Sequence, residues 1–379
     1  GGGVFVNALK MLVVPLVLFS LIPGIVGIGD IRLLGRVGGK AFGLYLASTA
    51  LAVATAIVFA LGFDIGSGGM PVGVAGEGFS GREAPPLTQV LIDIVPANPI
   101  AAMAGGEMLA VIFFAVVFGI GLLAVGREAG ELVRVLEQVN AVVLQMVSLV
   151  MHFAPYAVFC LIAKAVAELG VGLLVNLAGY VAVLAAALVF HAGVSLTGLL
   201  RVLTGLSPIV FLRKVRPAQL FAFSTASSGA TIPVTMQCVR ERLGVERSVA
   251  AFTVPFGATI NMDGTAIMQG VATVFIANIY GVDLGLVEYL TVILMAVLAS
   301  VGTAAVPGVG LVMLTMVFAQ VGLPVEGIGL LLGVDRLLDM LRTAVNVTGD
   351  AVVSTVVAKG EGKIDLGVYR DPRAGVLGG

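Results

Sequence analysis

The chain has 379 residues, of which 59% are hydrophobic and only 11% are charged, whereas soluble domains carry about 25% charged residues. Its formal net charge is −1, so no basic surface argues for nucleic acid, and we expect no nucleic-acid partner. This much apolar sequence can be buried only with a nonpolar solvent around it. The composition therefore predicts an all-α, multi-pass integral membrane protein that sits in the lipid bilayer of the cell membrane.

Apolar stretches of the first half are long enough for membrane helices, which need about 20 residues to cross a bilayer. We expect these helices at 4–28, 37–61, 108–125, 139–169 and 173–203. The polar stretch 63–88 is rich in Gly and Pro and predicts an exposed loop. Basic loops stay cytoplasmic. The net positive charge of 30–40 and 201–216 therefore predicts that these segments face inside, and the negative loop 63–88 faces outside.

After about residue 205, small residues and prolines interrupt the hydrophobic segments, at 224–233, 257–265 and 302–310. Irregular backbone at membrane depth must line a cavity or face protein, because exposed amides are costly in lipid. Broken segments in corresponding places point to a binding site near the middle of the bilayer. Pro233 and Asn261 are spaced like Pro307 and Asp335, which indicates a weak internal repeat.

These interruptions have distinct chemistry. The segment Ser227–Pro233 predicts a helix start, because serine caps a helix and Pro is tolerated in its first turn. Free N–H groups at such a start suit an anion such as an α-carboxylate. The glycine-rich segment 302–310 is its more flexible counterpart and suits a gate. The NMDGT sequence at 261–265 favours leaving the helix, and Asp263 with unwound carbonyls would offer oxygen to a small cation.

A polar stripe follows on the last hydrophobic segment, where Asp335, Asp339, Arg342, Asn346 and Asp350 are three or four residues apart. This spacing puts all five on one helix face. Charges in a membrane helix must face a cavity and have partners. Asp339 can hold an ammonium, Arg342 matches a carboxylate with two donors, Asn346 can donate and accept, and Asp350 suits sodium. The alternative is a structural salt-bridge network between helices.

Other polar residues give weaker signals. Tyr45, Ser48 and Thr49 share one helix face, and alone they are typical of hydrogen bonds between membrane helices. His152 and His191 have no acid or nucleophile pattern nearby, so we expect partnered core or interfacial residues. We also find no nucleophile–base pair or metal motif, which argues against an enzyme.

Four motifs, which follow one another along the chain in the family's order, resemble the glutamate/aspartate transporters of the dicarboxylate/amino acid:cation symporter family. They are NMDGT at 261–265, the serine-rich tip 227–233, the glycine-rich tip 302–310 and DRLLDMLRTAVNVTGD at 335–350. The likeness covers about 4 to about 360, including DIVPANP at 93–99. It begins where the family's second helix would, so we expect the first to be missing from this sequence.

The resemblance implies a multi-span helical bundle with inverted repeats and two re-entrant helical hairpins, near 207–240 and 286–321. It implies a homotrimer in which each transport domain moves past a static scaffold, as in an elevator. By likeness, the scaffold and trimerisation helices are 4–28 and 87–169. The transport domain is 37–63 and 173–360, and 361–379 is a cytoplasmic tail.

The resemblance also implies the function, sodium-coupled symport of aspartate or glutamate by alternating access. Asp339 would bind the amino group, Arg342 the side-chain carboxylate, and Asn346 with the serine tip the α-carboxylate. The full substrate set is Ser227, Ser228, Met262, Thr265, Val306, Gly310, Asp339, Arg342, Thr343 and Asn346.

The coupled sodium ions would occupy three sites that the resemblance implies. The first resembles a set made of Tyr45, Ser48, Thr49, Asn261 and Asp263. The second is similar to a set made of Gly257, Asn261, Asn346 and Asp350. The third, made mainly by backbone carbonyls, resembles Thr259, Met262, Ser300, Val301 and Thr303.

This sequence departs from the family's pattern at one charge. Archaeal members carry an arginine in the first hairpin tip, where this chain has Ala226, and animal members carry it just after the amino-binding Asp, where this chain has Met340. Arg336 is the alternative position for that charge. The alternative functions are proton coupling, transport of a C4-dicarboxylate or a neutral amino acid, and an anion channel. A neutral carrier should lack Arg342, and a dicarboxylate carrier should lack Asp339.

Overall fold

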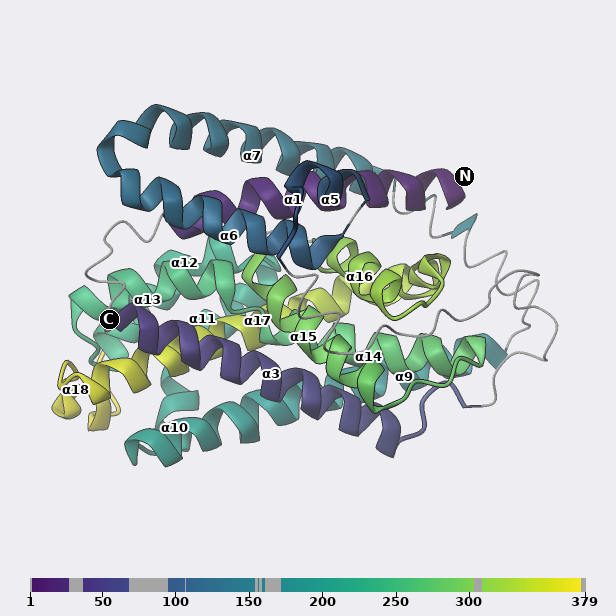
Figure 1. Ribbon diagram of the computed structural model, residues 1–379. Coiled ribbons are helices and arrows are strands. Elements are labelled where there is room, and N and C mark those ends of the chain that lie inside the picture. Colours follow the sequence, from purple (N-terminus) through teal and green to yellow (C-terminus); the bar gives the residue numbers. More distant parts are fainter. Residues whose placement is uncertain are drawn as a thin grey trace.

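The computed structural model describes residues 2–26, 37–67, 95–105, 107–153, 156, 159–160, 172–302 and 309–375. Within these ranges, the regular elements are helices, and the exception is an isolated antiparallel bridge between Val245 and Ile364. Many of the long helices run in a similar direction and form an elongated bundle (Figure 1). A helix satisfies its own backbone hydrogen bonds, which suits an apolar solvent.

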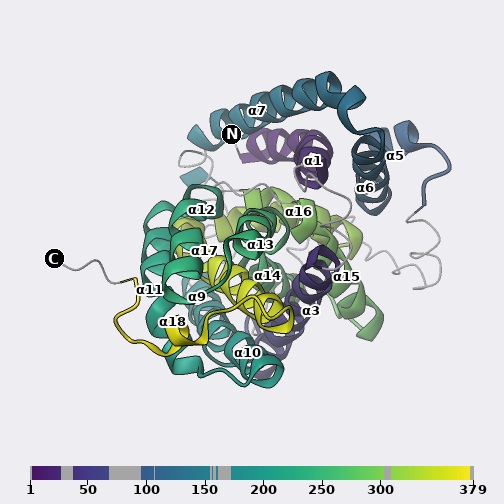
Figure 2. The same ribbon diagram turned by 90° about the vertical axis from the view of Figure 1, so that its left-hand side faces the viewer.

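One group of helices comes from the N-terminal half. It contains α1 (Gly2–Val26), α5 (Pro99–Gly105), α6 (Met108–Val125), the 3₁₀ turn η2 (Gly126–Ala129) and α7 (Gly130–His152). α1 packs against both α6 and α7, and the group stands along one side of the molecule (Figure 2). Close approach of α1 and α6 depends on Gly119, because a Cβ there would lie 3.0 Å from Ile25.

The larger group surrounds one long central helix. Its elements are α3 (Gly39–Gly62), α9 (Gly172–Phe190), the π-helical segment η3 (His191–Ser195), α10 (Leu196–Thr204), α11 (Pro208–Thr225), α12 (Ser228–Gln237), η4 (Cys238–Arg242), α13 (Arg247–Ile260), α14 (Asp263–Tyr280), α15 (Leu286–Gly302), α16 (Val309–Gln320), η5 (Val325–Gly327), α17 (Ile328–Gly360) and α18 (Leu366–Arg370). α17 packs against α9, α10, α11, α13 and α14. It is therefore buried along most of its length, together with nearly all of α14.

Three helical stretches among the described residues are long and apolar enough to cross a membrane: Gly39–Gly62, Phe113–Val143 and Val175–Thr204. α15 and α16 are apolar but shorter. They pack against each other, as do α11 and α12. We call the pairs α11–α12 and α15–α16 helix–tip–helix units, after the tips expected from the sequence. The tip of the first unit bends at Ala226, whose φ of 50° is left-handed, whereas residues 303–308 between α15 and α16 lie outside the described residues.

The helices differ from the sequence expectations in several places. The helix expected at 139–169 begins earlier, at Gly130. Glu131 and Arg134 lower the hydropathy of its first turn, so the apolar pattern starts later than the helix does. Most of the expected helix after residue 153 lies outside the described residues. The short α5 is absent from the expectations, since seven residues give no membrane-length signal. Pro233 lies inside α12 rather than in its first turn. Most of the expected loop at 63–88 lies outside the described residues.

The C-terminal segment 361–375 packs against the ends of the larger group. Lys214 of α11 donates from Nζ to the carbonyl oxygens of Arg242 and Val368, at 2.7 and 2.6 Å. The hydroxyl of Tyr369 donates to the Ser207 carbonyl at 3.0 Å, and burial raises the pKa of Tyr369 to about 12. These hydrogen bonds hold α18 against α11 and against Ser207, the residue before it.

Candidate functional site

The interruption between α13 and α14 forms the centre of the site. α13 ends at Ile260 and α14 begins at Asp263, so Asn261 and Met262 leave the helical path, as the NMDGT sequence predicts. All of these residues are buried. At Gly264 a Cβ would collide with the Arg342 backbone. Glycine therefore brings the start of α14 against α17.

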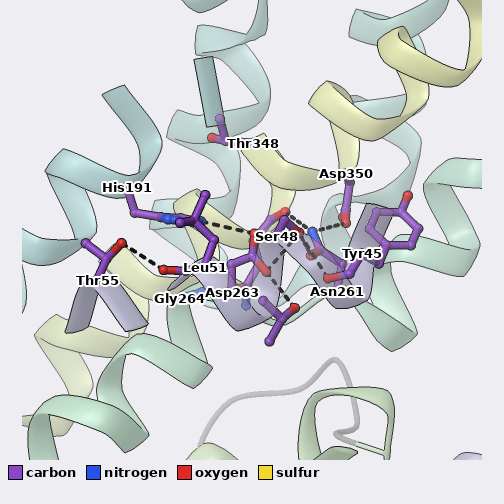
Figure 3. Close-up of polar contacts among 12 residues, drawn as sticks. Tyr45, Ser48, Leu51, Thr55, His191, Asn261, Asp263, Gly264, Thr348 and Asp350 are labelled. Carbon is purple, nitrogen blue, oxygen red and sulfur yellow. Dashed lines mark hydrogen bonds and ion pairs between the residues drawn. The ribbon is translucent and has the colours of Figure 1, made fainter. Parts of the chain in front are cut away.

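Hydroxyl and carboxylate groups meet at this interruption from the side of α3. Thr49 Oγ1 donates to Asp263 Oδ1 at 2.7 Å, and Ser48 Oγ lies 3.3 Å from the same oxygen. Ser48 Oγ is also 3.4 Å from Asn261 Oδ1 (Figure 3). The hydroxyl of Tyr45 donates to the Thr253 carbonyl at 2.9 Å. The two segments are more than 200 residues apart in sequence, and the fold joins them.

Asp350 of α17 approaches from the other side. Asn261 Nδ2 lies 3.0 Å from Asp350 Oδ1 and 3.2 Å from the Asn346 carbonyl oxygen. A Cβ at Gly257 would collide with the Asp350 carboxylate and the Tyr45 hydroxyl, so glycine is needed for their approach. We call Tyr45, Ser48, Thr49, Asn261, Asp263 and Asp350 the carboxylate cluster.

The carboxylate cluster holds two buried carboxyl groups without a lysine or arginine side chain beside them. Asp263 is 0% exposed and Asp350 is 1% exposed. In the described part of the chain, neither forms a salt bridge with a lysine or arginine, and His191 is the residue that lies within ion-pair distance of Asp263. Ionised carboxylates at this depth would need a compensating positive charge. Hydroxyl, amide and carboxylate oxygens are the ligands that hard cations prefer, so the donor set fits a sodium ion carried as cargo.

Arg342 forms the second centre, about two helical turns from Asp350 along α17. Its side chain is fully buried, with Nη2 donating to Asp339 Oδ1 at 2.8 Å. Nη1 lies 2.7 Å from Asp335 Oδ1, an ion pair whose angles are not those of a hydrogen bond. Nε has no hydrogen-bond acceptor among the described residues. The guanidinium therefore has donor capacity left for a further carboxylate.

Neighbouring residues enclose this guanidinium. A Cβ on Gly310 would lie 3.0 Å from Thr265 Cγ2 and 3.9 Å from Arg342 Nη2, so α16 and α14 both reach it. Thr343 Oγ1 donates to the Asp339 carbonyl at 2.8 Å. The stripe of α17 is thus buried on one face as predicted, and it faces protein.

Asn346 links the two centres. Its Oδ1 accepts from the Gly264 N–H at 2.7 Å, and its Nδ2 lies 3.3 Å from Met262 Sδ. The Asn346 carbonyl also accepts from Asn261. Both centres consequently share the α13–α14 interruption and one turn of α17.

The tip between α11 and α12 has the predicted capped helix start. Ser227 is the N-cap of α12 and its Oγ accepts from the Ala230 N–H at 3.2 Å, while Ser228 is buried. α12 also packs against α17. Arg336, the alternative position for the family's additional arginine, is exposed on α17, whereas Asp335 and Asp339 are buried.

The set expected for a third ion is described only in part. Ser300 Oγ donates to the Ile260 carbonyl at 3.1 Å, which brings the end of α15 to the end of α13. Val301 is buried and Thr259 is half-buried. Thr303 and Val306 lie outside the described residues, as does most of the tip 302–310.

The structure adds one residue that sequence reasoning did not place in the site. His191 Nε2 lies 3.2 Å from Asp263 Oδ2, and both side chains are fully buried (Figure 3). The two residues are 72 positions apart, and no local motif around His191 signals the contact. The expectation of a partnered core histidine is therefore confirmed, but its partner is a candidate ion ligand.

Comparisons with known proteins give the same family as the sequence motifs. A family model described as "Sodium:dicarboxylate symporter family" matches residues 1–360. The "Proton/glutamate-aspartate symporter" of Escherichia coli (strain K12) is 37% identical, covering 96% of this chain and 85% of the relative. The "Proton/sodium-glutamate symport protein" of Geobacillus stearothermophilus is 32% identical over 96% and 87%. The "C4-dicarboxylate transport protein" of Rhodospirillum rubrum is 34% identical over 96% and 83%.

Proposed function

This chain belongs to the sodium:dicarboxylate symporter family, and on that premise we propose that it carries aspartate or glutamate across the cell membrane together with sodium ions. The family consists of symporters, so the protein is a membrane symporter and not an enzyme. The names of its relatives divide between sodium and proton coupling and between amino acids and C4-dicarboxylates. The choice among them rests on the chemistry of the two centres.

Arg342 is the observation that carries the substrate assignment. A fully buried guanidinium with an unused Nε–H matches the side-chain carboxylate of an acidic amino acid, since arginine binds carboxylates with two parallel donors. Asp339, beside it on the same helix face, supplies the negative charge for the substrate's ammonium. A dicarboxylate without an amino group has no use for Asp339, and a neutral amino acid has no use for Arg342.

The α-carboxylate is assigned to Asn346 and to the start of α12. Ser227 and Ser228 stand where α12 presents its free N–H groups, and such a helix start favours an anion. The remaining contacts are proposed to line the pocket around the substrate. They are Met262, Thr265, Val306, Gly310 and Thr343.

The carboxylate cluster supports sodium as the coupled ion. A proton carrier needs only one titrating carboxylate, whereas this cluster brings hydroxyl, amide and carboxylate oxygens together. We assign one sodium to Tyr45, Ser48, Thr49, Asn261 and Asp263, and a second to Gly257, Asn261, Asn346 and Asp350. A third is assigned to Thr259, Met262, Ser300, Val301 and Thr303.

The two helix–tip–helix units support re-entrant hairpins near 207–240 and 286–321. Their helices have 18, 10, 17 and 12 residues, and about 20 are needed to cross a bilayer. Each unit therefore enters and leaves on one side in the proposed topology, which has inverted repeats and a cytoplasmic tail at 361–379. In this proposal the two tips would meet near the middle of the bilayer, which suits a site reached alternately from each side.

The division into two helix groups supports an elevator. The polar centres lie in the larger group, so the proposed transport domain comprises 37–63 and 173–360. The proposed scaffold comprises 4–28 and 87–169. α7 packs on α1 and buries Leu136 and Val143, and it exposes other apolar residues three, four or seven positions apart. This exposed stripe supports homotrimer contacts, and it consists of Leu132, Val135, Val142, Met146 and Leu149, followed by Phe153 just beyond the end of α7.

Uptake into proteoliposomes, with the sodium, proton and potassium gradients varied separately, tests this function. We expect concentrative uptake of labelled aspartate or glutamate that needs an inward sodium gradient. Equally good uptake driven by a pH gradient in sodium-free buffer would make the protein a proton symporter. Competition by succinate as strong as that by aspartate would favour a C4-dicarboxylate carrier, and flux without saturation would indicate a channel.

A further inference from the structure

His191 sits where a long apolar helix changes its geometry. α9 passes into the π-helical segment η3 (His191–Ser195) before α10 continues. A π segment inserts an extra residue into a turn, is rare, and is frequently found at functional sites. The inserted residue shifts the helix register, so side chains before and after it point in directions that a regular α-helix would not give them. Phe190 and Val194 are exposed, whereas His191 is fully buried.

Among the described residues, the buried imidazole has the carboxylate of Asp263 as its hydrogen-bond partner. An ionised carboxylate can only accept hydrogen bonds, so opposite ionised Asp263 the ring nitrogen that faces it, Nε2 at 3.2 Å, takes the donor role. The other nitrogen, Nδ1, is buried and has no hydrogen-bond partner among the described residues. A buried polar atom without a partner weakens a fold. An apolar side chain would fill the same space without that cost, so stability alone does not account for histidine here.

The two carboxylate oxygens of Asp263 have different hydrogen-bond partners. Oδ2 is held by His191, while Oδ1 faces Thr49 at 2.7 Å and Ser48 at 3.3 Å. Rotation of the carboxylate about its Cβ–Cγ bond would exchange these partners, and the contact with His191 opposes that rotation. Gly349 of α17 also packs closely against this carboxylate, because a Cβ at Gly349 would lie 3.2 Å from Asp263 Oδ2.

We infer that His191 is a positioning residue for ion coupling, which fixes the Asp263 carboxylate so that Oδ1 is presented to the cation beside the hydroxyls of α3. This inference rests on the proposed sodium coupling. His191 acts through Asp263 and does not itself contact the ion. Its effect is therefore on the affinity for sodium, and the substrate contacts around Arg342 are unchanged by it.

Three variants separate positioning from packing. His191→Leu fills the space without a donor, and His191→Asn keeps polarity but is too short to reach. His191→Gln carries an amide N–H near the position of Nε2, so it retains the donor. Thr273→Val is the matched control, because Thr273 is also fully buried and its hydroxyl donates only to the Gln269 carbonyl of its own helix.

The measurement is binding of labelled L-aspartate and L-glutamate to the purified protein over a range of sodium concentrations. Loss of one hydrogen bond to a charged group corresponds to about a tenfold change in an equilibrium constant. His191→Leu and His191→Asn should therefore raise the half-saturating sodium concentration by about tenfold. Substrate affinity at saturating sodium should stay at the wild-type value. His191→Gln and Thr273→Val should keep the wild-type sodium midpoint.

The outcomes are distinct for this inference and for the proposed function. A wild-type protein that binds substrate without sodium would overturn the function, and the inference with it. A sodium-dependent wild type whose midpoint is unchanged in His191→Leu would overturn the inference alone. Equal defects in His191→Gln and His191→Leu would also overturn it, because they would show that ring packing matters rather than the donor. If His191→Leu does not yield folded protein, His191→Asn against His191→Gln decides the same question.

Discussion

Replacing Arg342 by alanine tests the substrate assignment directly, because its guanidinium is the charge that would separate acidic from neutral amino acids. In the structure it is fully buried and holds Asp339 at 2.8 Å and Asp335 at 2.7 Å. Arg342→Ala therefore removes the proposed partner of the substrate's side-chain carboxylate. It also leaves two buried carboxylates one helical turn apart without their cation.

The magnitude follows from these contacts. Removing one partner of a buried, hydrogen-bonded charge pair costs about 2–5 kcal/mol in binding, and each 1.4 kcal/mol is about tenfold in affinity. Because Arg342 is not exposed, solvent screening does not reduce this range. Aspartate and glutamate should weaken by about 30-fold or more. Serine and alanine lose no such partner, so they should hold or gain affinity.

The assay is competition of acidic and neutral amino acids for labelled substrate at saturating sodium, in wild type and variant. Stability needs its own control, since breaking a buried ion pair costs about 3–5 kcal/mol of folding free energy. The double variant Asp335→Asn/Arg342→Ala removes one stranded carboxylate. It should recover part of the thermal stability while keeping the altered selectivity.

Two results would refute this reasoning. If acidic and neutral amino acids weaken equally, Arg342 is a structural ion pair and the substrate assignment loses its main support. If the double variant Asp335→Asn/Arg342→Ala restores selectivity for acidic substrates, the defect comes from the unpaired carboxylates rather than from the missing guanidinium.

Three further experiments probe other parts of the structure. Gly257→Ala would drive a methyl group into the Asp350 carboxylate and should abolish sodium-dependent binding, whereas Gly43→Ala, which has open space around it, should bind normally. Lys214→Met removes two hydrogen bonds from a buried ammonium and should cost about 2 kcal/mol, seen as a lower melting temperature and faster proteolysis of α18. The control Arg213→Gln changes an exposed basic residue of the same helix and should show neither effect. Cysteine pairs placed between α1 and α16, which pack together, should crosslink in two registers as ligands change, and one fixed register would contradict the elevator.

Much of the site follows from periodicity against an apolar background. Charged residues are rare in membrane segments, so Asp335, Asp339 and Arg342 at helical spacing stand out and predict a buried face. The helix interruption at 261–262 is equally predictable from its composition, because Asn, Asp and Gly favour leaving a helix. In both cases the structure confirms the local geometry that the sequence pattern indicates.

What the sequence did not predict depends on tertiary contacts or on mixed polarity. His191 lies in an apolar helical stretch, at the start of the π segment η3, and its contact with Asp263 joins residues 72 positions apart. The start of α7 at Gly130 escapes a hydropathy window because that turn is amphipathic. Likewise, Lys214 appears as one of several basic loop residues, although the fold buries it against two carbonyl groups.

The proposed coupling between sodium and substrate would have a physical basis in the segments that the two centres share. Asn261 donates to Asp350 and to the Asn346 carbonyl, and the Asn346 side chain in turn holds the Gly264 N–H. A cation that draws these oxygens together would also fix the turn of α17 that carries Arg342 and the start of α14 that touches it. The first ligand to bind would order this segment, so the second ligand would bind with a smaller loss of conformational entropy. Linkage is reciprocal, and the substrate must therefore raise sodium affinity by the same factor by which sodium raises substrate affinity.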